Sequence, residues 1–263
     1  LMEQNLLPAV TKKDSCISVF GRIQNSYFKS GTGSGGKVNV SKVWNIVEGL
    51  EESGQVKINP ELKKIYTEWE KSHPFDEGMG WGKEPWAQEE MPLSDQIVKD
   101  AAASSDLALV IIGRTAGEDK DNSASKGSWF LTDTEFDMLK KVREAFDKMA
   151  VVLNVGNIID MTFVAQIKPD ALLYGWQGGM LGGLGTADIL TGNINPSGKL
   201  TDTIAKKIED YPSHKYFGNL ERNFYSRAKN HSACLVFRYD FTRKTGLDGY
   251  YRFGRCTKRS FLF

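Results

Sequence analysis

The chain has 263 residues, of which 40% are hydrophobic and 25% are charged. This composition is ordinary for a globular protein and argues against disordered and membrane-spanning classes. The formal net charge is +1, but residues 222–263 hold ten Lys/Arg and two Asp/Glu, a net of +8. The rest of the chain therefore carries −7, so an acidic body precedes a basic tail.

The three cysteines, Cys16, Cys234 and Cys256, form no disulfide framework and show no metal-ligand spacing. A sparse, odd count is typical of a reducing compartment, so we expect a cytoplasmic protein. No apolar run approaches the roughly 20 residues of a membrane span, and no secretory signal is visible, although a leader could precede the first residue. We expect no metal, no cofactor and no membrane association.

The first third of the chain alternates between strand-like and helix-like segments. Residues 16–21 are expected to form a strand that ends on a glycine, and a glycine-rich loop follows at 30–36. Apolar residues spaced i, i+3, i+4, i+7 predict a helix over 43–50. A short strand at 56–58 and a helix over 60–71, with proline suited to its first turn, complete this part.

The middle of the chain begins with a different kind of segment. Residues 73–92 are rich in Gly, Pro, Trp and acid, and we expect a long ordered surface loop because its tryptophans, Trp81 and Trp86, are seldom found in mobile linkers. A serine-capped helix over 94–103 follows. The charge-free apolar run at 107–112 is typical of a strand buried on both faces.

The alternation continues with a helix over 132–148, opened by a capping box. Apolar strands are expected at 150–156 and 171–176, and a further helix at 182–190. Strands that are uniformly apolar and alternate with helices predict an α/β fold. We expect a three-layer α/β sandwich with a mostly parallel sheet of roughly six strands.

The pattern stops after Tyr225, so we divide the chain into a domain at 1–225 and a divergent basic tail at 226–263. Three explanations fit such a tail: a surface extension, a segment that binds nucleic acid and a reading-frame error. Nucleic-acid binding fits least well of the three. We expect no nucleic-acid partner.

A loop dense in charge follows the strand at 107–112 and includes Arg114, Glu118 and Asp121. In open α/β sheets the ligand crevice lies at the carboxyl ends of the strands. Charged side chains of this loop can therefore reach a bound ligand, and Glu118 is a candidate proton donor.

Two other features have more than one interpretation. The segment 31–36 fits the pattern GxGxxG, but it lacks the lysine of a P-loop and the acidic partner of a dinucleotide site. It is equally a turn that needs positive φ or a loop whose backbone approaches a ligand. Loop tryptophans, Trp81, Trp86 and Trp129, are either core residues or platforms for sugar rings.

Four segments taken together resemble a known family. They are 112–119 (IGRTAGED), 152–156 (VLNVG), 174–179 (YGWQGG) and 187–200 (ADILTGNINPSGKL). Their order and spacing resemble the α/β-sandwich domain of the family 3 glycoside hydrolases, the β-glucosidase group, over roughly residues 5–225.

The resemblance implies roles for particular residues. Glu118 matches the general acid/base of a retaining hydrolase, and Asp121 matches an aspartate that often follows it. Gly33 and Ser34 lie in a loop that borders the active site in that family, and Trp81 falls in an insertion seen in one branch. Our candidate substrate-binding residues are Gly33, Ser34, Trp81, Arg114 and Asp121.

The resemblance also implies a missing part. The family's nucleophile is an aspartate on a (β/α)8 barrel of about 250 residues, for which this chain has no room. We therefore expect a domain that hydrolyses terminal β-linked glucosides or oligosaccharides only with a barrel supplied in cis or in trans. Alone, the chain is expected to be inactive.

The chain departs from the family at two places. Leu181 stands where the family usually has a glutamate, and the sequence diverges after Tyr225, which favours a frame error or an altered terminus there. Two other functions stay open: a non-catalytic carbohydrate-binding or interaction module derived from such an enzyme and, more remotely, a nucleotide-binding α/β protein.

Overall fold

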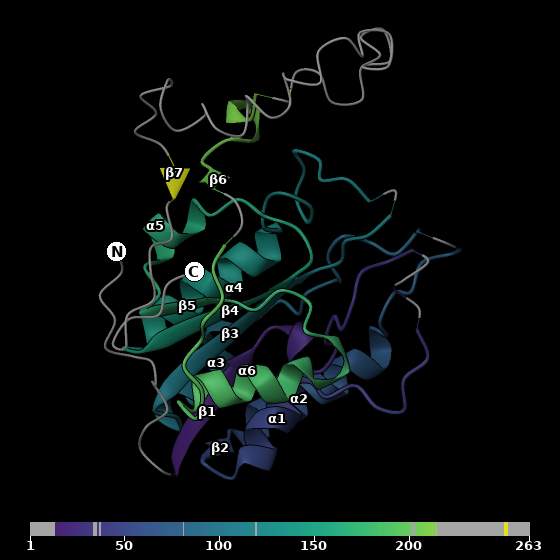
Figure 1. The fold of residues 1–263 in the computed structure, drawn as a ribbon. Coiled ribbons are helices and arrows are strands. Elements are labelled where there is room, and N and C mark those ends of the chain that lie inside the picture. The colour runs from purple at the N-terminus through teal and green to yellow at the C-terminus, as the bar shows by residue number, and fades with distance from the viewer. Residues whose placement is uncertain are drawn as a thin grey trace, which may run out of the picture.

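The computed structural model describes residues 14–33, 36, 38–80, 82–118, 120–200, 203–212, 214 and 250–251. Its centre is a parallel sheet with the strand order β2-β1-β3-β4-β5, covered by helices on both faces (Figure 1). The expected α/β sandwich is confirmed. Among the described residues this sheet has five strands rather than about six.

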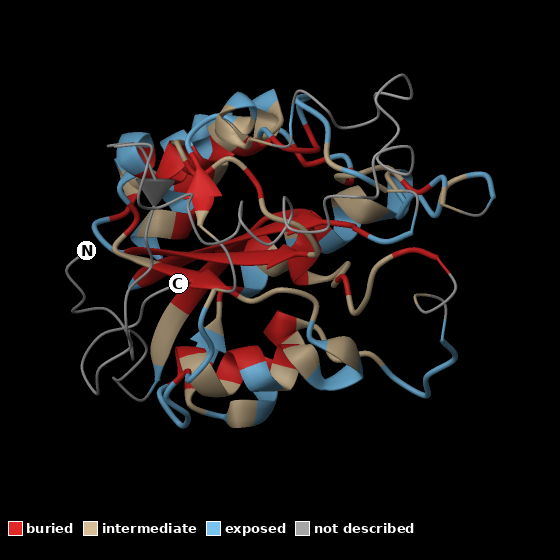
Figure 2. Cartoon of the chain, turned by 45° about the horizontal axis from the view of Figure 1, so that its top comes forward, coloured by how far each residue is buried: buried red, intermediate tan, exposed pale blue. Residues whose placement is uncertain are grey.

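The strands are β1 (Ser15–Phe20), β2 (Val56–Ile58), β3 (Leu107–Arg114), β4 (Met149–Val155) and β5 (Ala171–Tyr174). Each pairs with its neighbours in parallel. All residues of β3 and β4 are buried, and Figure 2 shows the sheet as the buried centre of the molecule. Continuous apolar runs suit this position, since both faces of a covered parallel sheet meet helices.

The helices are α1 (Ile46–Ser53), α2 (Pro60–Ser72), α3 (Asp95–Ala103), α4 (Asp133–Ala145), α5 (Phe163–Ile167) and α6 (Gly182–Leu190). α1 packs on α6, whereas α3 packs on α2 and α4, and α5 packs on α4. α1 and α6 can approach each other closely because Gly49 has no side chain. A Cβ at this position would lie 2.5 Å from the Gly183 carbonyl oxygen. These two groups of helices form the outer layers of the sandwich.

The bounds of α1 and α4 differ from those expected. α1 begins at Ile46, because the Asn45 side chain accepts the Glu48 N–H (2.8 Å) and Glu48 accepts the Asn45 N–H (3.0 Å). That capping box escaped the periodicity analysis. The expected capping box of Thr132 and Glu135 does open α4, but the helix ends at Ala145 because the next residue is extended. The five-residue α5 was not anticipated.

A second, smaller sheet joins β6 (Ile204–Ala205) to β7 (Tyr250–Tyr251) in antiparallel fashion. Residues 250–251 are the part of the tail at 226–263 that the structure describes. The division of the chain at residue 225 therefore stays a prediction. No helix in the described part of the chain is long and apolar enough to cross a membrane.

Candidate active site

Glu118 lies in the loop at 115–132, which connects the carboxyl end of β3 to α4. Its side chain is exposed in a turn. The preceding residue, Gly117, makes β-bridges to Thr32 and to Lys120. An ordered turn therefore presents this carboxyl group at the edge of the sheet where α/β proteins bind ligands.

The glycine loop lies directly beside Glu118. The Thr32 N–H donates to the Ala116 carbonyl (2.5 Å). Gly33 has a φ of 98°, and a Cβ placed there would lie 2.8 Å from the Cβ of Glu118. Gly33 therefore adopts the positive φ that one interpretation of this loop expects, and its lack of a side chain allows the close approach to Glu118. The other interpretation, a loop whose backbone approaches a ligand, stays a prediction. The structure brings these two candidate residues together.

The other candidate contacts are less fully defined. Asp121 is exposed, three residues beyond Glu118 in the same loop. Ser34 and Trp81 lie outside the described residues. The remaining loop tryptophans are clearer: Trp129 is a core residue, 1% exposed, whereas Trp86 is half-buried beside the Glu118 loop.

The segment at 73–92 is a loop, as expected, and it is tied to the Glu118 loop. The Trp86 carbonyl accepts the Thr115 N–H (2.9 Å). The Lys120 Nζ donates to the Glu84 carbonyl and lies 5.3 Å from the centre of the Trp86 ring. A cation over an aromatic face adds a further attraction. The two loops therefore form one ordered rim.

A pocket of about 350 Å³ opens between the loop after β1 and the segment at 75–84. Aromatic rings, hydroxyl groups and carboxylates line it: Tyr27, Phe28, Lys29, Ser30, Gly31, Thr32, Gly36, Val38, Asn39, Phe75, Glu77, Glu84 and Thr115. Thr32 belongs both to this wall and to the β-bridge next to Glu118. Apolar and aromatic surface combined with a few polar groups is typical of small-molecule sites.

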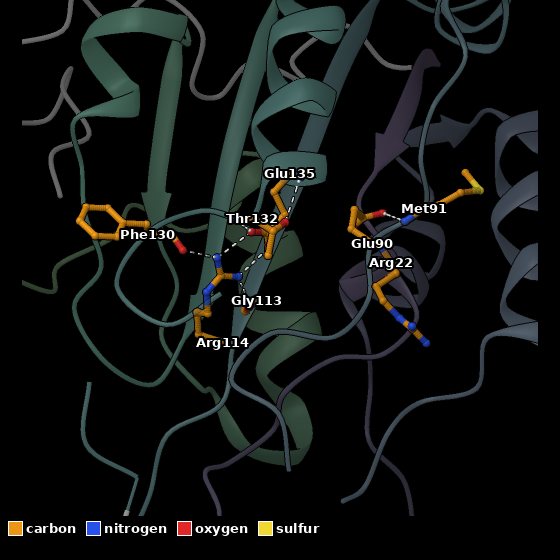
Figure 3. Close-up of polar contacts among 8 residues, drawn as sticks. All are labelled: Arg22, Glu90, Met91, Gly113, Arg114, Phe130, Thr132 and Glu135. Carbon is orange, nitrogen blue, oxygen red and sulfur yellow. Dashed lines mark hydrogen bonds and ion pairs between the residues drawn. The ribbon is translucent and has the colours of Figure 1, made fainter. Parts of the chain in front are cut away.

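Arg114 does not lie at the surface, contrary to what substrate contact requires. Its side chain is 1% exposed, and its two terminal nitrogens each bond a Glu135 carboxylate oxygen at 2.6 Å (Figure 3). The burial reflects its place as the last residue of the central strand. Direct contact between this side chain and a sugar does not fit this geometry.

Sequence reasoning missed Asn154, which lies near the end of β4 and holds the loops after β1 and β5 together. Its side-chain oxygen accepts the Phe28 N–H (2.8 Å), and its nitrogen donates to the carbonyls of Phe28 (3.0 Å) and Trp176 (2.7 Å). It is 1% exposed. A lone amide inside an apolar strand was the available signal, because a buried polar group needs partners.

Glu90, a buried carboxyl group at the end of the segment 73–92, was also missed. It is 7% exposed and accepts the N–H groups of Arg22 and Met91, each at 2.9 Å (Figure 3). Burial raises its pKa from 4.5 to about 8, although these hydrogen bonds oppose the shift. Its position marks it as structural, because access to a ligand is lacking.

The described residues contain no group of three or more His, Cys, Asp or Glu side chains able to hold a metal ion. The polar groups at the rim are instead carboxylates, amides and hydroxyls on backbone loops. This arrangement can donate or accept protons and hydrogen bonds.

Comparison with known families identifies the chain. The family described as "Glycosyl hydrolase family 3 C-terminal domain" matches residues 2–254. The chain belongs to this family. The match reaches beyond residue 225, where the motif-based resemblance ends.

Relatives support the same assignment. A β-glucosidase from Ruminococcus albus is 55% identical over 226 residues, which is 86% of this chain and 24% of that protein. β-Glucosidase A from Butyrivibrio fibrisolvens is 34% identical over 82% of this chain and 28% of its own length. The chain therefore spans about a quarter of the length of these curated relatives.

Solved structures agree in fold. A Paenibacillus barengoltzii β-glucosidase superposes with a TM-score of 0.79 at 48% identity, covering 83% of this chain and 24% of that one. β-Glucosidase 3B from Thermotoga neapolitana, solved with glucose, gives 0.74 at 32% identity over 85% of this chain and 31% of its own. The three-layer architecture is thus that of the family.

Proposed function

We propose that this chain is the acid/base-bearing domain of a retaining β-glucosidase-like hydrolase. The observation that carries the proposal is the exposed Glu118, held in a turn at the carboxyl edge of β3 against Gly33. In this role its carboxyl group protonates the glycosidic oxygen as the bond to the anomeric carbon breaks. The resulting carboxylate then removes a proton from the water that releases the sugar.

Four residues are proposed to contact the sugar around this carboxyl group: Gly33, Ser34, Trp81 and Asp121. The position of Gly33 gives this proposal its best support, because the Gly33 backbone lies next to Glu118. Asp121 is exposed in the same loop. Hydrogen bonds from such groups fix the ring while the proton moves.

The nucleophile is proposed to come from a (β/α)8 barrel, in cis or in trans. A retaining reaction needs a second carboxylate about 5 Å from the first, on the other side of the scissile bond. Exposed apolar side chains occur on several loops at the carboxyl edge, which suits a docked domain. They are Val38, Phe75, Met79, Phe130, Met180 and Leu181.

A chimera tests the proposal: this chain replaces the matching 226-residue segment of the Ruminococcus albus β-glucosidase. We expect the chimera to hydrolyse phenyl β-glucoside and the Glu118→Gln variant to be slower by about 10²–10⁴-fold. The isolated chain should hydrolyse this substrate no faster than its own Glu118→Gln variant. A fully active variant chimera, or turnover by the isolated chain that the substitution abolishes, contradicts the proposal.

A second function has one observation in its favour. The pocket beside the glycine loop is built by this chain alone and carries the rings of Tyr27, Phe28 and Phe75. Aromatic walls of this kind suit a non-catalytic sugar-binding module. Calorimetry of the isolated chain with glucose and cellobiose separates the two: tight binding together with an inactive chimera favours the module.

A further inference from the structure

Both ends of the loop that carries Glu118 meet at one buried side chain. Arg114, the last residue of β3, donates from Nη1 to the Gly113 carbonyl (2.6 Å) on its own strand. From Nη2 it donates to the Phe130 carbonyl (3.3 Å), near the far end of the loop. The guanidinium group therefore spans the base of the loop, as Figure 3 shows.

Glu135 completes this connection from the first turn of α4. Its two carboxylate oxygens accept Nη1 and Nη2 of Arg114, both at 2.6 Å. The same carboxylate accepts the Thr132 N–H (2.8 Å), and the Thr132 hydroxyl accepts the Glu135 N–H (3.1 Å). A planar, bidentate pair has one favoured geometry, so it fixes the start of α4 relative to the end of β3.

The near side of the loop is held by backbone hydrogen bonds. Thr115 donates to the Trp86 carbonyl (2.9 Å), and the Ala116 carbonyl accepts the Thr32 N–H (2.5 Å). Glu118 thus projects from a point two residues beyond a fixed backbone. The return path of the loop ends on Phe130 and Thr132, which the buried pair holds.

We propose that Arg114 and Glu135 are positioning residues for the Glu118 carboxyl group. They touch no sugar; they hold both ends of the loop so that the carboxyl group meets the glycosidic oxygen. This inference rests on the proposed acid/base role of Glu118. It explains why a charged pair occupies the interior at this point, where two apolar side chains would otherwise pack.

The loop contains a matched control. Lys126 and Asp133 join the same loop to the same helix at 2.6 Å, but their side chains are 63% and 83% exposed. The comparison therefore uses Arg114→Lys, Glu135→Gln and Lys126→Met in the Ruminococcus albus chimera. Arg114→Lys keeps the charge but loses the two-pronged geometry.

The readout is the ratio of kcat/KM on phenyl β-glucoside to kcat/KM on 2,4-dinitrophenyl β-glucoside. Phenol needs a proton in order to leave, whereas dinitrophenolate leaves without one, so the ratio reports proton donation. It does not depend on how much of the protein is folded. We expect Arg114→Lys and Glu135→Gln to lower the ratio by about 10–100-fold, and Lys126→Met to change it less than about twofold.

The outcomes separate the inference from the function on which it rests. If Glu118→Gln lowers the ratio but Arg114→Lys and Glu135→Gln slow both substrates equally, their role is structural and the inference is overturned. If Glu118→Gln itself leaves the ratio unchanged, the proposed function fails instead. Hydrogen exchange of the 263-residue chain gives a second measurement: amides of the loop should exchange faster in Arg114→Lys, and unchanged exchange overturns the inference.

Discussion

Two ion pairs connect the Glu118 loop to α4, and they differ in their access to water. Arg114 and Glu135 are 1% and 5% exposed, whereas Lys126 and Asp133 are 63% and 83% exposed, at the same distance of 2.6 Å. In the interior neither charge can exchange its partner for water. At the surface both can, and the net attraction is small. We therefore expect the two pairs to contribute very unequally to the order of the loop, although their distances are equal.

The largest effect is expected from breaking the buried pair on one side. Arg114→Met leaves the Glu135 carboxylate buried without its guanidinium partner, which costs about 3–5 kcal/mol of unfolding free energy. Urea denaturation of the chain measures it. The double variant Arg114→Met/Glu135→Leu should recover part of the loss, because no orphan charge remains. A cost below about 1 kcal/mol for the single variant means that water reaches Glu135.

A second buried carboxyl group sharpens the comparison through pH. Unlike Glu135, Glu90 is not paired with a guanidinium group that bonds both of its oxygens. Burial raises its pKa from 4.5 to about 8. The folded state therefore favours the protonated form. Its contribution to stability is complete below pH 4.5 and is lost as the pH rises through about 8, by about 1.4 kcal/mol per pH unit in between.

The measurement compares the native chain with Glu90→Gln across this range. We expect the unfolding free energy of the native chain to fall between pH 5 and pH 8 relative to that of the variant. The variant is less stable at pH 5, since an amide nitrogen cannot accept the N–H that Glu90 accepts from Arg22. Parallel pH profiles for the two proteins indicate that Glu90 is ionised in the folded state.

A third test concerns the contact between the glycine loop and Glu118. In Gly33→Ala the new methyl group meets the Glu118 Cβ at 2.8 Å and the residue keeps a φ of 98°, so we expect a loss of about 1–3 kcal/mol. Gly54 also has positive φ, 61°, but nothing lies within 4 Å. Gly54→Ala should therefore cost only about 1 kcal/mol. Equal losses, read from thermal unfolding, show that backbone strain alone matters at Gly33.

The sheet was predictable because its signal is local. β3 and β4 contain short apolar runs, and runs of this length that are rich in β-branched residues are typical of strands buried on both faces. The capping box of α4 was also recognisable from the sequence, because Thr132 and Glu135 are three residues apart. Glu118 was proposed from its place after a buried strand and from the family motif, and its acid/base role stays a prediction.

The contacts that define the site were not predictable, because they join distant parts of the chain. Asn154 forms hydrogen bonds with Phe28, 126 residues away, and neither segment contains a sequence pattern that predicts this contact. Arg114 was misjudged for the same reason. A charged residue at a strand end suggests exposure, and only the three-dimensional arrangement places Glu135 opposite it. Sequence patterns give the element that carries a side chain more reliably than the direction in which it points.

The smallest effect is expected at the exposed pair, and it decides whether the comparison holds. Lys126→Met removes the ion pair with Asp133 and leaves both positions open to water, so the unfolding free energy should change by less than about 0.5 kcal/mol. Raising the salt concentration should erase even this difference, because exposed charges are screened. Urea denaturation at low and high salt measures both. A loss comparable to that of Arg114→Met would mean that any tie between loop and helix suffices, and burial would then no longer distinguish the two pairs.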